Sequence, residues 1–322
     1  MHPLVFEPYL RPMIWGGRKL AELFARRLPG GGPFGESWDL SPHPHHVSRV
    51  AEGAHAGRTL TDLCREEPAA LFGATPPADA RFPLLVKLLD CRDRVSLQVH
   101  PNDALAARLA GERFGKAEAW VILDTYPDAV VYAGLQSGVT RAEVEHRLSA
   151  GTLIEAMHRF TPTPGDCLFL PAGTVHAAGG VVLAEVQQAS DATFRLHDWD
   201  RLGPDGKPRP LHVTEALQAI DWSIGPVHPV VPARTAERLV TCREFLLDRI
   251  TPVAECPAPP GRLSVWLVLA GAADLRTADG YRRRFARGDT VLIPAAAETP
   301  RWHPGADDPP VSLLCVTIPE SA

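Results

Sequence analysis

The chain has 322 residues, 45% of them hydrophobic, and a formal net charge of −5 from 33 basic and 38 acidic side chains. This length allows one large core or two smaller ones, and the slightly acidic balance, with no basic run longer than 282–284, argues against a nucleic-acid partner. The longest apolar stretch, 263–273, is interrupted and is far shorter than the ~20 residues of a membrane-spanning helix.

The N-terminus and the cysteines both predict a cytoplasmic protein. The first segment carries Glu7 and prolines where a secretory signal needs a basic start and an uninterrupted apolar core. Six cysteines are scattered without a Cys-x-x-Cys pair, which is typical of buried small hydrophobic residues in a reducing compartment. We expect them to be structural rather than paired in disulfides.

Short runs rich in Val, Leu and Ile predict strands, because 32 prolines and 26 glycines separate them. The sequence therefore predicts a mostly β protein. In chain order the expected strands include 84–89, 95–100, 117–124, 129–133, 166–170, 181–187, 265–270 and 290–294.

Three short helices are expected to flank the sheets. The last is the best marked, because Thr140 and Glu143 form a capping-box pattern and Gly151 can close the helix. The expected helices cover 60–71, ended by Gly73, a segment that begins after Asn102 or Asp103, and 141–150.

An internal repeat organises the strands. Segments 164–177 (PGDCLFLPAGTVHA) and 287–300 (RGDTVLIPAAAETP) share Gly-Asp, an apolar run and a proline at one spacing, and 118–124 has its counterpart in 264–271. Such units resemble the cupin family of small double-sheet barrels. The expected fold class is mostly β, with two cupin-like double-sheet β-barrels and a few short flanking helices.

A domain boundary is expected near residue 235. The segment 203–210 is polar and turn-rich, and prolines recur at Pro226, Pro229 and Pro232. We expect residues 1–235 to form the catalytic domain with the metal site. Residues 236–322 should form a cupin-like domain without metal ligands.

Gln98 and His100 are separated by one residue of a predicted strand, so both side chains can point into one cavity. Glu118 follows eighteen residues after His100, and His176 comes much later. Two imidazoles, a carboxylate and an amide oxygen suit a divalent ion of zinc's borderline character. The candidate metal ligands are therefore Gln98, His100, Glu118 and His176.

Comparison of the two copies assigns the metal to the first. Ser264 stands where the first copy has Glu118, and Thr299 stands where it has His176. The second copy has lost its ligands. We therefore expect one Zn²⁺ per chain and a second barrel that braces the first.

Seven motifs in order carry a resemblance to a known family. They are IWGG (14–17), GESWDLSPHP (35–44), FPLLVKLLD (82–90), SLQVHPND (96–103), GKAEAW (115–120), LPAGTVHA (170–177) and SDATFRLHDWDR (190–201). Over residues 8–222 the chain resembles class I mannose-6-phosphate isomerase in its short form, without the large helical insertion. One departure is HPHHVS (43–48), where the family's usual turn is of HPNG type.

The resemblance implies an activity and a set of site residues. The family's zinc ligands fall on the four residues named above, and its active-site arginine falls on Arg195. Lys116 and Glu185 match positions that line the same pocket, and Ser96 matches a phosphate donor. The implied reaction interconverts mannose 6-phosphate and fructose 6-phosphate.

This isomerisation moves a proton between C2 and C1 through an enediol(ate), so it needs a base, a stabiliser of negative oxygen and a phosphate-binding group. A metal stabilises the oxygen as a Lewis acid, and Arg195 and Lys116 suit the phosphate and the developing charge. Glu185, Lys116 and a hydroxide on the metal are all able to act as the base. The alternative for Arg195 is a surface ion pair with Asp198 or Asp200.

Two other functions fit the same residues. One is an iron cupin oxygenase that uses two histidines and a carboxylate as a facial triad, and Gln98 as a fourth ligand argues against it. The other is a non-catalytic protein that binds a sugar phosphate, and the presence of Arg195 and Lys116 favours catalysis over it. In each case the partner is a small molecule, and the sequence leaves the oligomeric state open.

Overall fold

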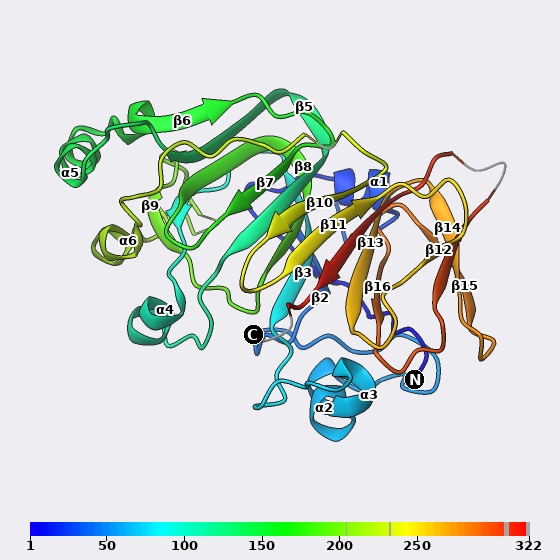
Figure 1. Ribbon diagram of the computed structural model, residues 1–322. Coiled ribbons are helices and arrows are strands. Elements are labelled where there is room, and N and C mark those ends of the chain that lie inside the picture. Colours follow the sequence, from blue (N-terminus) through cyan, green and yellow to red (C-terminus); the bar gives the residue numbers. More distant parts are fainter. Residues whose placement is uncertain (204, 232, 306–308, 320–322) are drawn as a thin grey trace.

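The structure is a computed structural model that describes residues 1–203, 205–231, 233–305 and 309–319 (Figure 1). Two positions of the expected turn segments, 204 and 232, lie outside the described residues. Strands take 38% of the model and helices 15%, so the prediction of a mostly β fold is confirmed. All strand pairings within the described sheets are antiparallel.

Residues 1–235, called the first half below, contain a nine-stranded sheet built around one central strand; residues 236–322 are called the second half. That strand, β8, pairs with β3 and β4 on one side and with β5 on the other. The strands are β1 (Tyr9–Arg11), β2 (Glu36–Leu40), β3 (Leu84–Cys91), β4 (Leu97–Val99), β5 (Glu118–Leu135), β6 (Met157–Phe160), β7 (Cys167–Leu170), β8 (Val175–Gln188) and β9 (Phe194–His197).

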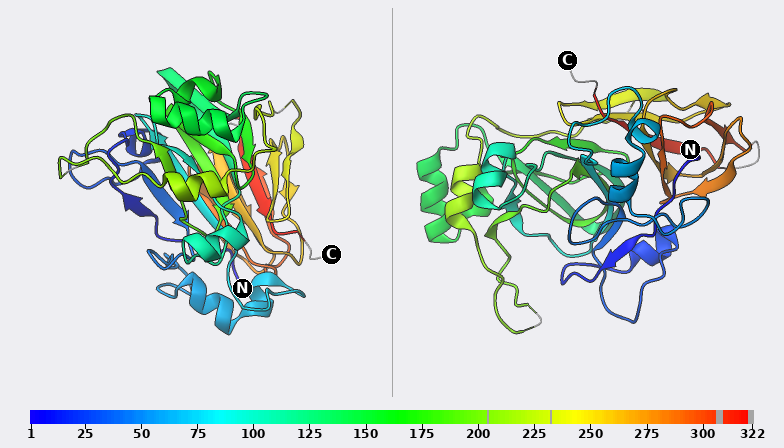
Figure 2. Two further views of the ribbon diagram at one scale, coloured as in Figure 1. Left: turned by 90° about the vertical axis from the view of Figure 1, so that its left-hand side faces the viewer. Right: turned by 90° about the horizontal axis from the view of Figure 1, so that it is seen from below.

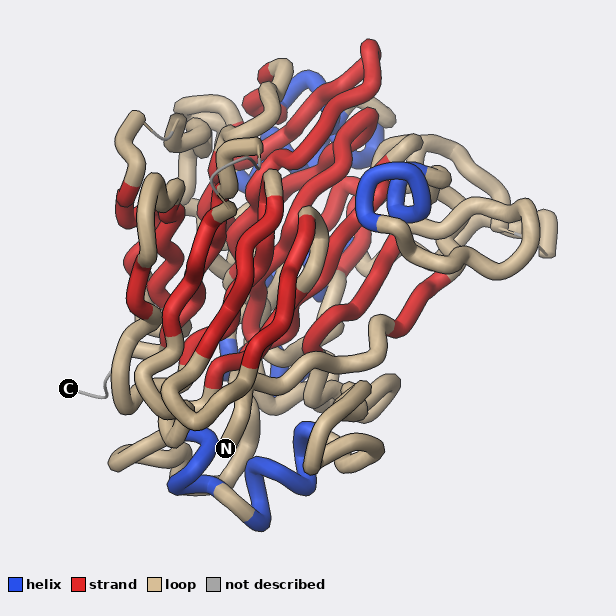
Figure 3. Tube along the Cα trace, turned by 90° about the vertical axis from the view of Figure 1, so that its right-hand side faces the viewer, coloured by secondary structure: helices blue, strands red, loops and turns tan. Residues whose placement is uncertain are grey.

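The second half builds two smaller sheets that lie beside the first (Figures 1 and 3). None of the three described sheets closes on itself as a barrel. The five-stranded sheet runs β10 (Ala236–Thr241), β11 (Leu246–Ile250), β18 (Ser312–Thr317), β13 (Ser264–Ala270) and β16 (Thr290–Ile293). The four-stranded sheet runs β12 (Cys256–Pro257), β17 (Arg301–Pro304), β14 (Ala272–Arg276) and β15 (Arg282–Ala286).

Alternating side chains of β13 divide the second half between two cores. Val265 and Leu267 belong to a core that also holds Leu84 and Val86 of β3, whereas Trp266 packs with the smaller sheet. Period-two alternation places successive side chains on opposite faces, so one strand serves both cores. The large sheets of the two halves are therefore joined by one continuous hydrophobic core.

The repeat is visible as one pairing pattern used twice. Glu118 pairs with Leu170 across β5 and β7, and Ser264 pairs with Ile293 across β13 and β16. The turn before each short strand is held alike, because Gly165 N–H donates to Ile122 O and Gly288 N–H to Val268 O, both at 2.8 Å. The two copies thus share local geometry around positions that differ in chemistry.

The helices lie at the periphery (Figures 1 and 2). The predicted helix over 60–71 is wrong as a single element, because Pro68 disfavours the helical conformation at Glu67, where φ is −132° and ψ is 46°. The helices are α1 (Lys19–Phe24), α2 (Leu60–Glu66), α3 (Pro68–Phe72), α4 (Asp103–Leu109), α5 (Arg141–Ala150), a 3₁₀ turn (Leu153–Ala156) and α6 (Val213–Ala219).

The predicted helix ends are mostly confirmed. Asn102 caps α4 by accepting from Leu105 N–H, and Gly151 ends α5 with φ of 71°. Thr140 caps α5 by accepting from Glu143 N–H. The reciprocal bond of a capping box does not form, since the Glu143 carboxylate accepts from Arg147 instead.

The strands around the site are longer than expected. Segments 117–124 and 129–133 belong to one bulged strand, β5, and β8 begins before the predicted 181. The added part of β8 contains Gly179 and Gly180. A Cβ at Gly179 would meet Arg94 Cγ at 2.5 Å, so glycine is needed there for close packing.

No helix in the described part of the chain is long and apolar enough to cross a membrane. All six cysteines, each a described residue, are free thiols, and four of them are buried. Burial raises the pKa of the Cys64 and Cys167 thiols to about 12 in each case, which keeps them protonated and unreactive. These positions fit the expected structural role.

Candidate active site and metal centre

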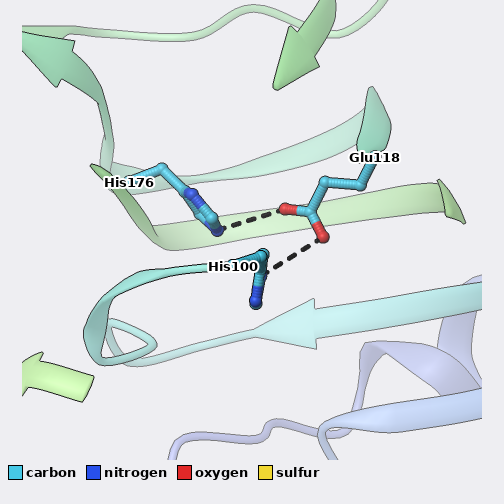
Figure 4. A group of neighbouring side chains, drawn as sticks. All are labelled: His100, Glu118 and His176. Carbon is cyan, nitrogen blue, oxygen red and sulfur yellow. Dashed lines mark ion pairs between the residues drawn. The ribbon is translucent and has the colours of Figure 1, made fainter. Parts of the chain in front are cut away.

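Three strands of the first sheet bring His100, Glu118 and His176 together (Figure 4). His100 follows β4 directly, Glu118 begins β5 and His176 lies near the start of β8. Glu118 Oε2 lies 3.5 Å from His100 Nε2, and Glu118 Oε1 lies 3.1 Å from His176 Nε2. All three residues are buried, and the cluster is able to hold a metal ion.

Backbone carbonyls orient both imidazoles towards this centre. His100 Nδ1 lies 2.8 Å from Ala192 O, and His176 Nδ1 lies 2.9 Å from Thr174 O. A carbonyl only accepts, so each Nδ1 carries the proton and each Nε2 keeps a free lone pair. Both nitrogens that face Glu118 are therefore in the form that binds a metal.

The spacing and the unsatisfied oxygens fit a tetrahedral ion. Ligand atoms about 2.0–2.2 Å from such an ion lie about 3.3–3.6 Å from one another, close to the 3.1 and 3.5 Å observed. Both Glu118 oxygens are buried without a hydrogen-bond donor of good geometry, although Lys116 Nζ lies 3.0 Å from one of them. A cation between these groups would satisfy them.

Burial and charge set the protonation of the cluster. Burial, followed by the charge of Lys116, holds the pKa of His100 well below its usual range, so the imidazole is neutral. Burial alone raises the pKa of Glu118, but the charge of Lys116 is the largest opposing cause, and the net pKa is well below its usual range. Neutral imidazoles and an ionised carboxylate are the states that metal binding requires.

Gln98 lies beside the two histidines. It is the direct cross-strand partner of His176, and its Nε2 lies 3.4 Å from His100 Nε2 and 3.5 Å from His176 Nε2. Ser96 Oγ donates to Gln98 Oε1 at 3.0 Å. A half-turn of the amide would direct Oε1 to the cluster, so Gln98 as a fourth ligand stays a prediction.

The other candidate residues line one cavity of about 270 Å³ beside the cluster. Its lining includes every predicted substrate-binding or catalytic residue, namely Ser96, Lys116, Glu185 and Arg195, together with the candidate ligand Gln98. Lys116 Nζ also lies 3.1 Å from His100 Nε2 and 3.0 Å from Glu118 Oε2, so it connects the cavity with the metal centre.

Glu185 belongs to a buried row across three strands. It is the cross-strand neighbour of Lys87 on β3 and of Trp120 on β5. Lys87 Nζ lies 3.0 Å from Glu185 Oε1, and the Trp120 indole N–H donates to Glu185 Oε2 at 3.0 Å. The carboxylate is therefore held in the cavity wall by two neighbours.

Arg195 lies on β9 as the cross-strand partner of Gln98. It does not form the alternative pair with Asp198, because that carboxylate is taken by Arg201 and Arg209. The Arg195 guanidinium donates to Pro210 O at 2.8 Å, while its buried Nε has no partner within the described structure. Its position in the cavity wall leaves it available to a ligand.

Further charged residues, not predicted from the sequence, line the cavity, among them Arg11, Lys87, Asp191 and Arg209. Lys87 had a detectable signal, because it interrupts the continuous apolar run of a buried strand. Burial alone raises the pKa of Asp191, but Lys87 and Lys116 outweigh it and the net pKa is lowered. Asp191 and Arg209 carry no local signal, since only long-range folding brings them here.

The histidine-rich loop after β2 stays apart from the metal cluster. His43 is buried, its Nδ1 accepts from His45 N–H, and its Nε2 lies 3.1 Å from Glu112 Oε1. His45 Nδ1 lies 3.7 Å from Asp191, which links the loop to the edge of the cavity. These contacts do not gather a second set of metal ligands from the loop.

The amino-acid sequence is similar to those of known mannose-6-phosphate isomerases. Residues 4–135 match the model of the phosphomannose isomerase type I catalytic domain. Mannose-6-phosphate isomerase ManA of Bacillus subtilis is 38% identical over 298 residues, which cover 91% of this chain and 93% of that protein. Mannose-6-phosphate isomerase of Streptococcus mutans is 34% identical over 72% of this chain and 71% of its own length.

The fold also matches that of a solved structure over nearly the whole chain. The crystal structure of mannose 6-phosphate isomerase from Bacillus subtilis superimposes with a TM-score of 0.88 at 29% identity, covering 99% of this chain and 100% of the other. Both halves of the fold are included in that match. Because the chain is 38% identical to ManA over 91% of its length and shares its fold with a solved mannose 6-phosphate isomerase, we conclude that the chain is an enzyme of the type I mannose-6-phosphate isomerase family.

Proposed function

We propose that this protein is a zinc-dependent aldose–ketose isomerase that interconverts mannose 6-phosphate and fructose 6-phosphate through an enediol(ate). The observation that carries the proposal is the buried His100, Glu118 and His176 cluster beside a cavity rich in basic side chains. The names of the Bacillus and Streptococcus relatives support the same substrate. Of the three functions open to the sequence, family membership favours this one.

The residues that would hold the ion are His100, Glu118 and His176, with Gln98 as the proposed fourth ligand. Two imidazoles and a carboxylate suit zinc, which has no redox chemistry and needs none for a proton shift. When bound, one Zn²⁺ per chain would polarise the sugar oxygens as a Lewis acid. The counterpart positions Ser264 and Thr299 offer no such ligand set, which supports one ion per chain.

The chain's own side chains would supply the remaining chemistry. Lys116 would stabilise negative oxygen as a buried ammonium next to the metal centre. Glu185, held by Lys87 and Trp120, would accept or return the proton between C2 and C1. Arg195 and Ser96 would bind the substrate from the cavity wall.

The two halves of the chain would have different roles. We propose residues 1–235 as the catalytic domain and 236–322 as a structural one, both variants of a cupin-like double-sheet design. The common core between them supports a bracing role for the second domain. A cytoplasmic location is supported by six free thiols, since a reducing compartment keeps cysteines unpaired.

Turnover of Arg195→Ala tests the proposed function. The wild type should convert mannose 6-phosphate in a coupled assay, and the variant should lose about 10²-fold or more in turnover, as the loss of a charge-stabilising donor typically costs. Metal content and circular dichroism should stay unchanged, because Arg195 contacts neither the cluster nor the core through its charge. We would measure all three on the same preparations.

Two results would count against the proposal. A wild type with a full complement of zinc that cannot convert mannose 6-phosphate would exclude the isomerase function. Near-normal turnover of Arg195→Ala would remove Arg195 from the active site and return it to a structural role.

A further inference from the structure

Basic side chains outnumber acidic side chains in the wall of the cavity. Five basic and three acidic side chains line it among the described residues. Arg11, Lys87 and Lys116 each lie within 4.0 Å of an acidic side chain of the cavity wall. The remaining two, Arg195 and Arg209, have no ion pair with an acidic side chain of the cavity wall in the described structure, and the ion-pair partner of Arg209 is Asp198, outside the wall.

A turn after β9 brings Arg209 to this place. Leu202 bridges to Pro208, and Gly203 N–H donates to Lys207 O at 2.7 Å, so the chain doubles back on itself. Figure 2 shows this segment, in yellow-green, projecting from the body of the protein. Arg201 and Arg209 flank the bridge and therefore lie side by side.

Asp198 fixes both arginines with one carboxylate. Arg209 Nε donates to Asp198 Oδ2 at 2.7 Å, and Arg201 Nη2 donates to Asp198 Oδ1 at 2.6 Å. Asp198 itself is buried, so these bonds are little screened by solvent. Of the two arginines, only Arg209 lines the cavity, whereas Arg201 lines a separate surface cleft with Arg94 and Trp199.

We infer that Arg209 is a specificity-determining residue that binds the phosphate of the substrate together with Arg195, and that Asp198 is the residue that positions it. The inference rests on the proposed function, and it names the side chains that distinguish a sugar phosphate from a neutral sugar.

The physical reason is the local charge. Arg195, Arg201 and Arg209 lie near the single carboxylate of Asp198, so a net positive field remains, which a phosphate dianion neutralises and which a neutral hydroxyl does not. Burial, followed by the charge of Arg209, lowers the pKa of Arg195, as expected for two cations in the wall of one cavity. A bound phosphate would relieve that repulsion.

Arg209→Gln and Arg201→Gln form a matched test, because both variants remove one arginine from Asp198 and only the first changes the cavity. In Arg209→Gln, KM for mannose 6-phosphate should rise about 10- to 100-fold, the range for a lost hydrogen bond to a charged group, and kcat should fall less. The inhibition constant of inorganic phosphate should weaken by a similar factor. Arg201→Gln should keep both constants close to the wild type.

Two further variants separate positioning from general stability. Asp198→Asn should raise KM as Arg209→Gln does while metal content and the circular dichroism spectrum stay those of the wild type, and Arg209→Lys should restore part of the affinity for phosphate. Equal KM and phosphate inhibition in Arg209→Gln and Arg201→Gln would overturn the inference.

A direct measurement of phosphate binding tests the role of Arg209 separately from isomerase activity. Titration calorimetry of the wild type with inorganic phosphate needs no turnover. Phosphate binding that is lost in Arg209→Gln would support the inference even if the wild type converted no sugar phosphate. Turnover by the wild type with phosphate binding intact in Arg209→Gln would refute the inference and leave the isomerase function standing.

Discussion

His176→Ala is expected to lose most of its metal and nearly all isomerase activity. His176 supplies one of the two imidazoles of the cluster, and its removal leaves Glu118 Oε1 without its neighbour at 3.1 Å. Loss of a group that only supports a ligand already costs ~10- to 100-fold in metal affinity, and loss of a ligand should cost more. Metal analysis of the purified variant checks this, with about one zinc per chain expected in the wild type.

His158→Ala is the matched control. His158 lies on β6 and packs against His228, away from the cavity, so its loss removes a histidine and keeps the cluster. It should retain metal and turnover. Full zinc occupancy in His176→Ala, or two zinc ions per wild-type chain, would refute the single-site assignment.

A chain cut after residue 235 is expected to aggregate or fail to fold. Eleven C-terminal side chains belong to the core shared by the two halves. They are Leu239, Val240, Phe245, Leu247, Leu263, Val265, Leu267, Leu269, Leu292, Leu314 and Val316. The cut would expose the apolar side chains of the same core that remain, such as Leu84 and Val86, and a large exposed apolar patch leads to aggregation.

A point variant makes the same test without a cut. Leu267→Arg buries a charge in the shared core and should lower the melting temperature steeply or prevent soluble expression. Val253→Arg, at a side chain that is 92% exposed in the same half, should behave like the wild type. A soluble, zinc-loaded and fully active fragment 1–235 would contradict the bracing role of the second half.

Local signals in the sequence predicted much of the fold. Alternating apolar runs located the main strands, and Asn102 and Gly151 located helix ends, because each effect acts within a few residues. The same signals missed the break before Pro68 and the start of β8 before residue 181. Gly179 within β8 is explained by packing against Arg94, a contact that no local pattern encodes.

In the candidate site too, local patterns predicted some residues, whereas others are brought in only by long-range folding. Strand periodicity pointed to His100, and the loss of their counterparts in the repeat pointed to Glu118 and His176. The structure brings the ligand atoms of the three within 4.8 Å of one another. Asp191 and Arg209 were not nominated, because they lie in loops whose position depends on cross-strand pairing and on the turn after β9. Closed barrels were also expected, whereas the described sheets stay open.

The most direct test of the account is turnover of mannose 6-phosphate before chelation, after chelation and after zinc is restored. The buried cluster predicts that removing the metal abolishes conversion to fructose 6-phosphate, because Lys116, Glu185 and Arg195 alone cannot polarise the sugar oxygens as a Lewis acid does. Added zinc should restore activity in proportion to about one ion per chain. Full turnover by a chelated protein that analysis shows to be free of metal would contradict the account.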